Sequence, residues 1–229
     1  RRYLLEMRPL GSPQAARTLR GERVLLLGSG ALAEPLAQSI RRAGGTIETA
    51  ECKNRKQAIG AIAAAESRGA VHHLVLLARN PEGKCLAWPA EKETRVESMF
   101  FATQQWLTAR EAAGDLATAS LTALVDLGGD FGLSGHIPQV EGGALCGLLK
   151  NLNREYPEAH VRVVDAISQL PAEVLCERFV AEMCDAAGPV EIGLTTSGRH
   201  AAAVCHEELA GSASHLPEEL KRGSVWMVT

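Results

Sequence analysis

Two glycines spaced as in dinucleotide-binding turns are the first residues of this sequence whose pattern suggests chemistry. Gly28-Ser29-Gly30-Ala31-Leu32-Ala33 fits the pattern G-x-G-x-x-A and lies between an apolar run and a helical pattern. Glycines at these positions permit a tight turn and let backbone N–H groups approach a pyrophosphate. Glu48 and Glu51 follow about 20 residues later, where a ribose-binding carboxylate is expected. Gly28, Gly30 and Glu48 or Glu51 are therefore candidate cofactor-binding residues, although a β-α turn without a ligand favours the same small residues.

A tyrosine paired with a lysine, as used for proton transfer in many hydride-transferring reductases, is not found. Such a pair stands four residues apart on one helix face, where the lysine lowers the tyrosine pKa. The sequence holds two tyrosines, Tyr3 and Tyr156. Tyr3 lies in a predicted strand, whereas Tyr156 precedes Pro157 and has His160 at its i+4 position. We therefore assign no catalytic residue to this chain.

The remaining polar motifs receive structural interpretations or stay open. His72-His73 begins a predicted strand and is expected to be a structural pair at a sheet edge. Asp126 and Asp130 follow another strand, where both ligand binding and turn formation are possible. Ser134-Gly135-His136 has no acid at a spacing typical of a hydrolase triad.

The cysteine pattern argues against a metal site and suggests a reducing compartment. The six cysteines include no C-x-x-C pair, and the sequence has no H-E-x-x-H. Several of them fall in helical apolar patterns of a sizeable chain. We interpret them as reduced thiols of a cytoplasmic protein.

Strands and helices are predicted to alternate along most of the chain. Short apolar runs predict strands at Arg2–Arg8, Arg23–Leu27, Thr46–Ala50, Val71–Ala78, Leu121–Leu127, Val161–Val164, Val190–Leu194 and His200–Val204. Helical spacing predicts helices through Leu32–Ala43, Ala58–Ala65, Val96–Leu107, Val140–Tyr156 and Cys176–Met183. Asn54 is the expected cap of the second helix, and Ser197-Gly198 is the expected tip of a terminal hairpin.

This alternation predicts an α/β fold with a truncated Rossmann-like, doubly wound and mostly parallel sheet. The longest helix should place one apolar face on the sheet. Its expected residues are Val140, Ala144, Leu145, Leu148, Leu149 and Leu152.

Composition and charge narrow the classes of partner. The 229 residues are 46% hydrophobic and 22% charged, which is typical of a globular domain with a real core. The formal net charge is −3, and we find no basic stripe with interleaved aromatics, so nucleic acid is not an expected partner. Apolar runs are too short to span a bilayer, and the first residues do not read as a signal peptide.

The last twenty residues differ from the rest. Ala210–His215 is a plausible linker, and Val225–Thr229 is strand-like. A native domain seldom ends within an apolar strand. We therefore expect the natural protein to continue beyond Thr229.

Three stretches together resemble the ketoreductase region of polyketide synthases and of polyunsaturated-fatty-acid-type synthases. They are Arg2-Tyr3-Leu4-Leu5-Glu6-Met7-Arg8-Pro9; the segment from Gly142-Gly143-Ala144-Leu145 to Glu155-Tyr156-Pro157, followed by Val161-Arg162-Val163-Val164-Asp165; and Gly223-Ser224-Val225-Trp226-Met227-Val228-Thr229. The second is similar to the family's "G-A-L-x-G-L-x-K-T-L-x-x-E-x-P…R-x-V-D" segment. The third is similar to the strand that leads into its catalytic nucleotide loop.

The resemblance implies a division into two parts and a structural role for this chain. In that family a degenerate Rossmann-like half precedes a catalytic half, which binds NADPH and reduces a β-ketoacyl group carried by an acyl carrier protein. Residues 1–221 would then be the structural subdomain and residues 222–229 the first strand of the catalytic one. The expected partners are the catalytic subdomain, neighbouring synthase domains and the acyl carrier protein. No cofactor is expected in this chain, which leaves Gly28, Gly30 and Glu48 vestigial.

Two other hypotheses stay open. The chain could be a free-standing NAD(P)-binding oxidoreductase that uses Gly28, Gly30 and Glu48 or Glu51. It could instead be an interaction module for neighbouring synthase domains. Nucleotide binding is the property that separates the first of these from the structural interpretation.

Overall fold

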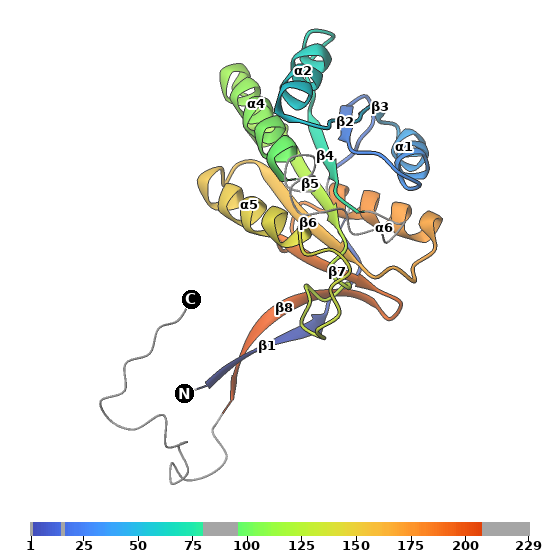
Figure 1. The fold of residues 1–229 in the computed structure, drawn as a ribbon, viewed down its shortest axis with the longest axis vertical. Coiled ribbons are helices and arrows are strands. Elements are labelled where there is room, and N and C mark those ends of the chain that lie inside the picture. Colours follow the sequence, from blue (N-terminus) through green and yellow to red (C-terminus); the bar gives the residue numbers. More distant parts are fainter. Residues whose placement is uncertain (1, 15–16, 80–95, 208–229) are drawn as a thin grey trace, which may run out of the picture.

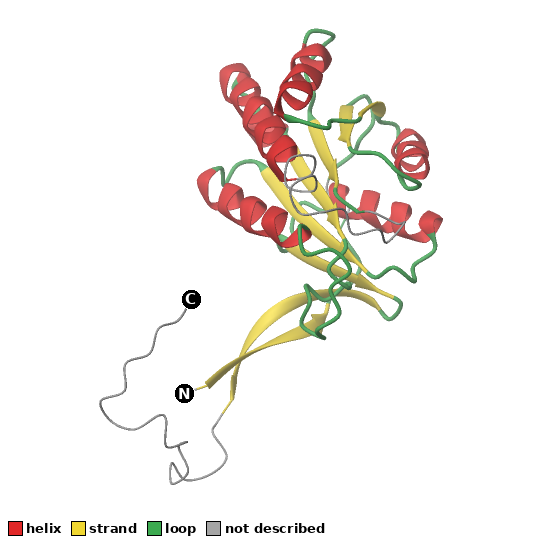
Figure 2. Cartoon of the chain, viewed as in Figure 1, coloured by secondary structure: helices red, strands yellow, loops and turns green. Residues whose placement is uncertain are grey.

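The computed structural model describes residues 2–14, 17–79 and 96–207, which form one eight-stranded sheet with helices on both faces (Figures 1 and 2). The strands are β1 Arg2–Pro9, β2 Arg23–Leu27, β3 Thr46–Ala50, β4 His73–Leu77, β5 Ser120–Val125, β6 His160–Ala166, β7 Glu191–Thr195 and β8 Gly198–Glu207. Across the sheet they follow the order β1-β8-β7-β6-β5-β4-β2-β3.

Six strands form the parallel body of the sheet. Each of the neighbouring pairs from β3 through β2, β4, β5 and β6 to β7 is parallel, whereas β8 is antiparallel to both β7 and β1. The sheet grows outward from β2 in one direction to β3 and in the other through β4, which makes β2 and β4 the topological switch point. The predicted α/β, mostly parallel, truncated Rossmann-like sheet is thus confirmed.

The helices cover the two faces unequally. They are α1 Ala33–Arg42, α2 Arg55–Glu66, α4 Ser98–Ala113, α5 Gly142–Glu155 and α6 Ala172–Cys184, with a short 3-10 helix at Leu116–Thr118. Helices α2, α4 and α5 lie on one face, while α1 and α6 lie on the other (Figure 1). Right-handed crossovers between parallel strands produce this two-sided cover.

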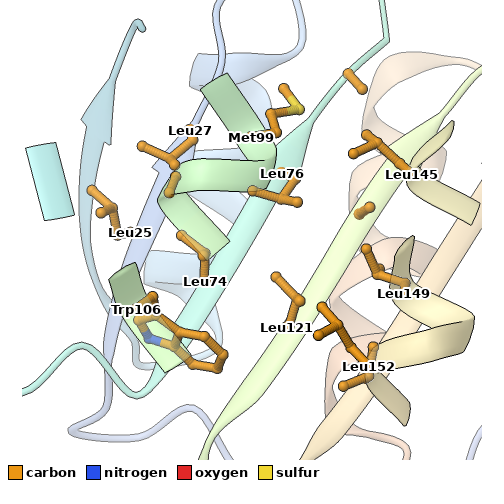
Figure 3. Packing of buried hydrophobic residues seen from close by; sticks show 14 of the residues in the cluster. Leu25, Leu27, Leu74, Leu76, Met99, Trp106, Leu121, Leu145, Leu149 and Leu152 are labelled. Atoms are coloured by element: carbon orange, nitrogen blue, oxygen red, sulfur yellow. The ribbon is translucent and has the colours of Figure 1, made fainter. Parts of the chain in front are cut away.

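Aliphatic side chains fill both layers of the core. Figure 3 shows the layer beneath α4 and α5, where strand leucines such as Leu74 and Leu121 face Trp106 and Leu149. The Trp106 indole N–H donates to the Val71 carbonyl oxygen at 2.8 Å, so its one polar group is satisfied although the side chain is fully buried. Leu36 of α1 and Phe179 of α6 lie in the opposite layer.

Strands β1 and β8 leave the body of the sheet as a two-stranded ribbon (Figures 1 and 2). Eight residue pairs join them, from Arg2 with Glu207 at the tip to Pro9 with His200 near the body. The predicted hairpin joins β7 to β8, and Gly198 adopts φ +134° at its turn. The ribbon is the part of the described chain with the least cover from helices.

The local signals that set helix ends were identified correctly. Asn54 caps α2, since its side-chain oxygen accepts a hydrogen bond from the Gln57 N–H at 3.0 Å. Helix α1 ends before the Gly44-Gly45 pair, and Pro171 precedes the first residue of α6. These ends depend on side chains near in sequence, which is why the sequence alone could locate them.

Two predictions about burial are wrong. His73 is not at a sheet edge, because β4 lies between β2 and β5 and its His73 side chain is buried. On α5, Ala144 is exposed, and Val140 lies before the helix with 64% of its surface exposed. The face that packs on the sheet is Leu145, Cys146, Leu149 and Leu152, with Leu148 half-buried beside it.

Candidate functional site

The carboxyl ends of the parallel strands form the edge where a doubly wound sheet binds its ligands. The Gly28–Ala33 turn joins β2 to α1 at this edge, beside the β2–β4 switch point. Gly28 and Gly30 adopt φ values of +132° and +108°, which side-chain-bearing residues rarely adopt. The sequence pattern therefore located a genuine glycine turn in the correct topological place.

Packing against β4 accounts for Gly28 without any ligand. A Cβ atom at Gly28 would collide with the carbonyl oxygen of Leu77 and approach the Leu77 Cβ to 2.9 Å. The Gly28 N–H donates to the Ala50 carbonyl oxygen at 2.9 Å, so it is already engaged within the sheet. The close approach of two strands is thus sufficient reason for glycine at this position.

The N-terminus of α1 carries a negative charge where a pyrophosphate would have to approach. Glu34 lies in the first turn of α1, and its carboxylate accepts hydrogen bonds from Gln38 and Arg41 at 3.2 Å. A carboxylate in the first turn interacts favourably with the positive end of the helix dipole. A bound phosphate would make the same kind of interaction. The adjoining Glu51 is a second acid, at the position where a ribose-binding carboxylate is expected.

The two acidic candidates have different surroundings. Glu48 lies in the middle of β3 and forms ion pairs with Arg23 and Arg68. The hydrogen bond from Arg68 is the main reason why the pKa of Glu48 lies below its usual value. Glu51 is the first residue after β3 and accepts a hydrogen bond from the Ser29 hydroxyl at 3.2 Å. The fold therefore brings Glu51, and not Glu48, to the glycine turn.

A buried ion pair occupies the ends of β4 and β5. The Arg79 Nε lies 3.4 Å from an Asp126 carboxylate oxygen, and both side chains are at most 5% exposed. A further Arg79 nitrogen donates to the Ile167 carbonyl oxygen at 3.2 Å, beyond the end of β6. Burial raises the pKa of Asp126, and the neighbouring Arg79 opposes that effect. Arg79 was not predicted from the sequence, where its only signal is an arginine two residues after a mostly apolar strand.

Asp165 anchors the loop that follows β5. Its carboxylate accepts hydrogen bonds from the Leu127 and Phe131 N–H groups at 2.6 and 2.8 Å. Burial raises the pKa of Asp165 to about 6, although these hydrogen bonds act in the opposite direction. Asp130 accepts from the backbone N–H groups of Gly132 and Ser134, as a turn residue does. Both aspartates therefore serve the loop backbone rather than an open site.

Neither tyrosine can supply proton transfer at this edge. Tyr3 lies on the ribbon, with its ring 5.7 Å from that of His206. Tyr156 follows the last residue of α5, in the segment that leads to the amino end of β6. Because parallel strands share one direction, that end lies on the opposite edge of the sheet from the Gly28 turn.

The described residues reveal no centre of another kind. Among them, no group of three or more His, Cys, Asp and Glu side chains is placed to hold a metal ion. No helix in the described ranges is both long and apolar enough to cross a bilayer. The five cysteines within those ranges are free thiols.

Comparisons with solved structures place this geometry among known folds. Neither a protein-family model nor a curated protein matches the chain. A C2-type ketoreductase from a modular polyketide synthase superposes with a TM-score of 0.65 at 17% identity, over 91% of this chain and 44% of that one. A-type ketoreductases from a modular polyketide synthase give 0.64 at 21% identity, over 93% and 44%. The chain shares their fold.

The predicted resemblance is therefore confirmed at the level of fold. The chain spans less than half the length of these ketoreductases. It also resembles a short-chain dehydrogenase/reductase from Brucella melitensis described as a glucose/ribitol dehydrogenase. That match has a TM-score of 0.60 at 16% identity and covers 77% of this chain and 95% of the dehydrogenase. The described residues thus form a Rossmann-like unit.

Proposed function

We propose that this chain is the structural, non-catalytic half of a ketoreductase in a polyketide or polyunsaturated fatty acid synthase. Three features support the proposal: the fold shared with ketoreductases, a match that covers 44% of those chains, and the buried Arg79–Asp126 ion pair at the strand ends. In this proposal residues 1–221 form the structural subdomain and residues 222–229 begin the catalytic one. Residues 208–229 lie outside the described ranges.

The observation that carries the proposal is an exposed apolar face on the β1–β8 ribbon. Tyr3 and Leu5 are two residues apart on β1, so their side chains lie on the same face of the ribbon. Val204 of β8 is paired with Leu5. Their exposed fractions are 60%, 58% and 68%. Adjacent apolar side chains on one face of a protruding ribbon are typical of a surface that another protein unit covers. A catalytic half joined to the same chain is the unit we propose.

A groove between α4 and α5 offers a second surface for the same neighbour. It has a volume of about 420 Å³. Apolar side chains line it from both helices, among them Phe100, Leu107, Leu148 and Leu152. Phe100 is exposed and Leu148 is half-buried, so both could gain cover from a partner. We propose that α4 and α5 brace the catalytic half through this groove.

The chemistry would then belong to the adjoining half. We propose that NADPH binds there and that the β-ketoacyl group arrives there on an acyl carrier protein. The chain described here would contribute stability and orientation to that half. Gly28, Gly30 and Glu48 would have no role in cofactor binding.

Activity of the longer protein tests the proposal. In a protein that contains both halves, Leu5→Asp should place a charge in the covered face of the ribbon. We expect lower thermal stability and a loss of β-keto reduction in proportion to the unfolded or dissociated fraction. Val140→Asp is the matched control, because Val140 is equally exposed but lies outside the ribbon and the groove. Equal activity of both variants and the unmodified protein would contradict the proposal.

A nucleotide titration separates the structural proposal from the free-standing oxidoreductase. The chain is titrated with NADPH and with NADH while nucleotide fluorescence is followed. The structural proposal gives no saturable signal with either. A saturable signal that is lost in Glu51→Gln would favour the free-standing oxidoreductase, because Glu51 is the acid at the glycine turn.

A further inference from the structure

A small polar cavity lies at the amino end of β6, on the opposite edge of the sheet from the glycine turn. Its volume is about 210 Å³, and its polar side chains come from Arg17, Asn153, Glu158 and His160. Gly188 completes part of its wall. Neither the proposed structural role nor the fold explains why polar side chains gather there.

Arg17 brings a positive charge to this cavity without a carboxylate partner. Its guanidinium donates to the carbonyl oxygens of Ala117 and Ala119 at 2.8 and 3.4 Å, which fixes its position. Its backbone N–H donates to the Cys184 carbonyl oxygen at 3.1 Å. Within the described ranges, Arg17 has no ion pair within 4 Å. A half-buried cation of this kind is stabilised by an anion.

Gly188 separates the cavity from a second guanidinium. A Cβ atom at Gly188 would lie 2.6 Å from Nη2 of both Arg162 and Arg199. The backbone of Gly188 does not adopt a positive φ, so the conformation itself does not require glycine. The absent side chain instead leaves the arginines directly behind the cavity wall.

The donors behind that wall are buried and incompletely used. Arg162 is fully buried, and its Nε and Nη2 atoms have no hydrogen-bond partner. Its Nη1 donates to the Glu182 carbonyl and carboxylate oxygens at 2.6 and 3.0 Å. Glu182 and Asp185 together balance the charges of Arg162 and Arg199. Arg17 is therefore the guanidinium that reaches the cavity lining, and the charge of Glu22 also acts on it.

His160 adds a neutral ring to the lining. Its Nε2 is buried and has no hydrogen-bond partner. Burial is the main cause that lowers the pKa of His160 to about 4, and the charges of Arg162 and Arg17 act in the same direction. The cavity lining thus combines a cation, Arg17, with a neutral imidazole, His160. Glu158 is the one acidic side chain in its lining, and it is exposed to solvent.

We propose that this cavity is a binding site for a phosphate-sized oxyanion, with Arg17 as its charge partner and His160 as a hydrogen-bonding group. An oxyanion offers acceptor oxygens in several directions, which matches a donor-rich lining. The site is separate from the glycine turn and from the surfaces assigned to the catalytic half. It could take free phosphate or the phosphate group of a small phosphomonoester.

Calorimetric titration of the full chain with inorganic phosphate tests the site, with chloride adjusted to constant ionic strength. We expect saturable binding and a melting temperature that rises with phosphate concentration as expected for a ligand of the folded state. Arg17→Gln should abolish both effects. Arg154→Gln, which removes an exposed arginine in the last turn of α5, should preserve them. A rise in melting temperature that persists in Arg17→Gln would be general salt stabilisation and would overturn the proposal.

A second variant keeps the test decisive if Arg17→Gln does not fold. Glu158→Gln removes the acid in the lining, so phosphate should bind about threefold tighter or more through reduced repulsion. Unchanged affinity in Glu158→Gln, or no binding to the unmodified chain, would overturn the proposal. Glycerol 3-phosphate is titrated in parallel. Tighter binding of this ester identifies a phosphomonoester as the ligand, whereas tighter binding of phosphate identifies the free anion.

Discussion

Single residues at the glycine turn show how one pattern can serve two purposes. G-x-G-x-x-A indicates either a pyrophosphate site or a close approach between β2 and β4, and sequence alone cannot separate them. The contact between Gly28 and Leu77 supports the packing role. The distinction depends on residues far apart in sequence, which meet only in the folded sheet.

Substitutions in this turn should therefore change stability more than reductase activity. We expect Gly28→Ala to cost about 2 kcal/mol or more, because φ is +132° and the new Cβ collides with Leu77. Gly30→Ala should also destabilise the turn, since φ there is +108°, yet leave activity of the parent reductase largely intact. Urea denaturation and NADPH kinetics measure the two effects. A large loss of NADPH affinity in Gly30→Ala at unchanged stability would contradict the structural assignment.

His73, which is buried, and His160, which is half-buried, should make the chain sensitive to mild acid. Burial lowers the pKa of both His73 and His160 to about 4, and Arg17 acts on each in the same direction. In the unfolded chain both should titrate near the ordinary value of about 6.5. The unfolded state then binds more protons between these values, so stability is complete above about pH 6.5 and falls toward pH 4. Below pH 4 this contribution levels off.

Urea denaturation across this pH range measures the effect. We expect His73→Gln to flatten the pH dependence, whereas His206→Gln on the exposed ribbon should leave it unchanged. The raised pKa of Asp165 works in the opposite direction, because protonation near pH 6 favours the folded state. Comparison of the two histidine variants removes that contribution, since Asp165 is present in both. Identical slopes in both variants would show that His73 is not the group responsible.

At the scale of elements, most strands could be predicted because a short continuous apolar run in the sequence is typical of a buried strand. Arg23–Leu27 was predicted with both ends correct, and the terminal hairpin was predicted from its turn residues. Strand order could not be predicted in this way. The cluster of Arg162, Glu182, Asp185 and Arg199 joins β6, the end of α6 and β8, and no local pattern indicates it.

Helix α5 shows why the buried face of a helix was harder to predict than its existence. Two apolar rows lie side by side, one through Ala144 and Leu148 and the other through Leu145, Leu149 and Leu152. The position of the first turn of α5 against the sheet determines that the second row is the buried one. A Cβ at Gly142 would lie 3.0 Å from the Val125 Cβ and 3.2 Å from the Leu127 side chain, so this end is close to the sheet.

Truncation of the two rows should give different costs. We expect Leu149→Ala to lower the free energy of unfolding by ~2–5 kcal/mol, the usual cost of a buried leucine. Leu148→Ala should cost less, because Leu148 is half-buried at the edge of the groove. Ala144→Ser should be nearly neutral, because Ala144 is exposed. Chemical denaturation ranks the three variants, and a larger loss in Leu148→Ala than in Leu149→Ala would reverse the assignment of the buried face.

At the scale of the whole molecule, the described residues combine buried charged side chains at the ligand-binding edge with an exposed apolar ribbon and a groove of mixed polarity. Arg79, Asp126 and Asp165 are buried near the carboxyl ends of the strands, the edge where a doubly wound sheet binds its ligands. The ribbon and the α4–α5 groove expose apolar side chains on other parts of the surface. The exposed ribbon fits the proposed role of a unit that supports a neighbour.

An isolated chain with an uncovered ribbon should therefore associate with itself. Exposed apolar ribbons and strand edges favour pairing between molecules, and β1 is an edge strand. We expect the triple variant Tyr3→Ser, Leu5→Ser and Val204→Ser to reduce concentration-dependent association while the melting temperature changes little. The side chains are largely exposed, so their removal costs little packing. Sedimentation velocity over a range of concentrations measures the association.

The matched control removes the other exposed aliphatic residues, as Leu133→Ser, Ile137→Ser and Val140→Ser. It lowers the exposed apolar surface by three side chains without touching the ribbon. If association persists in this control and disappears in the ribbon variant, the chains associate through β1 and β8. The reverse result would place it on the loop before α5. That result would contradict the proposal that the ribbon is the surface covered by the catalytic half.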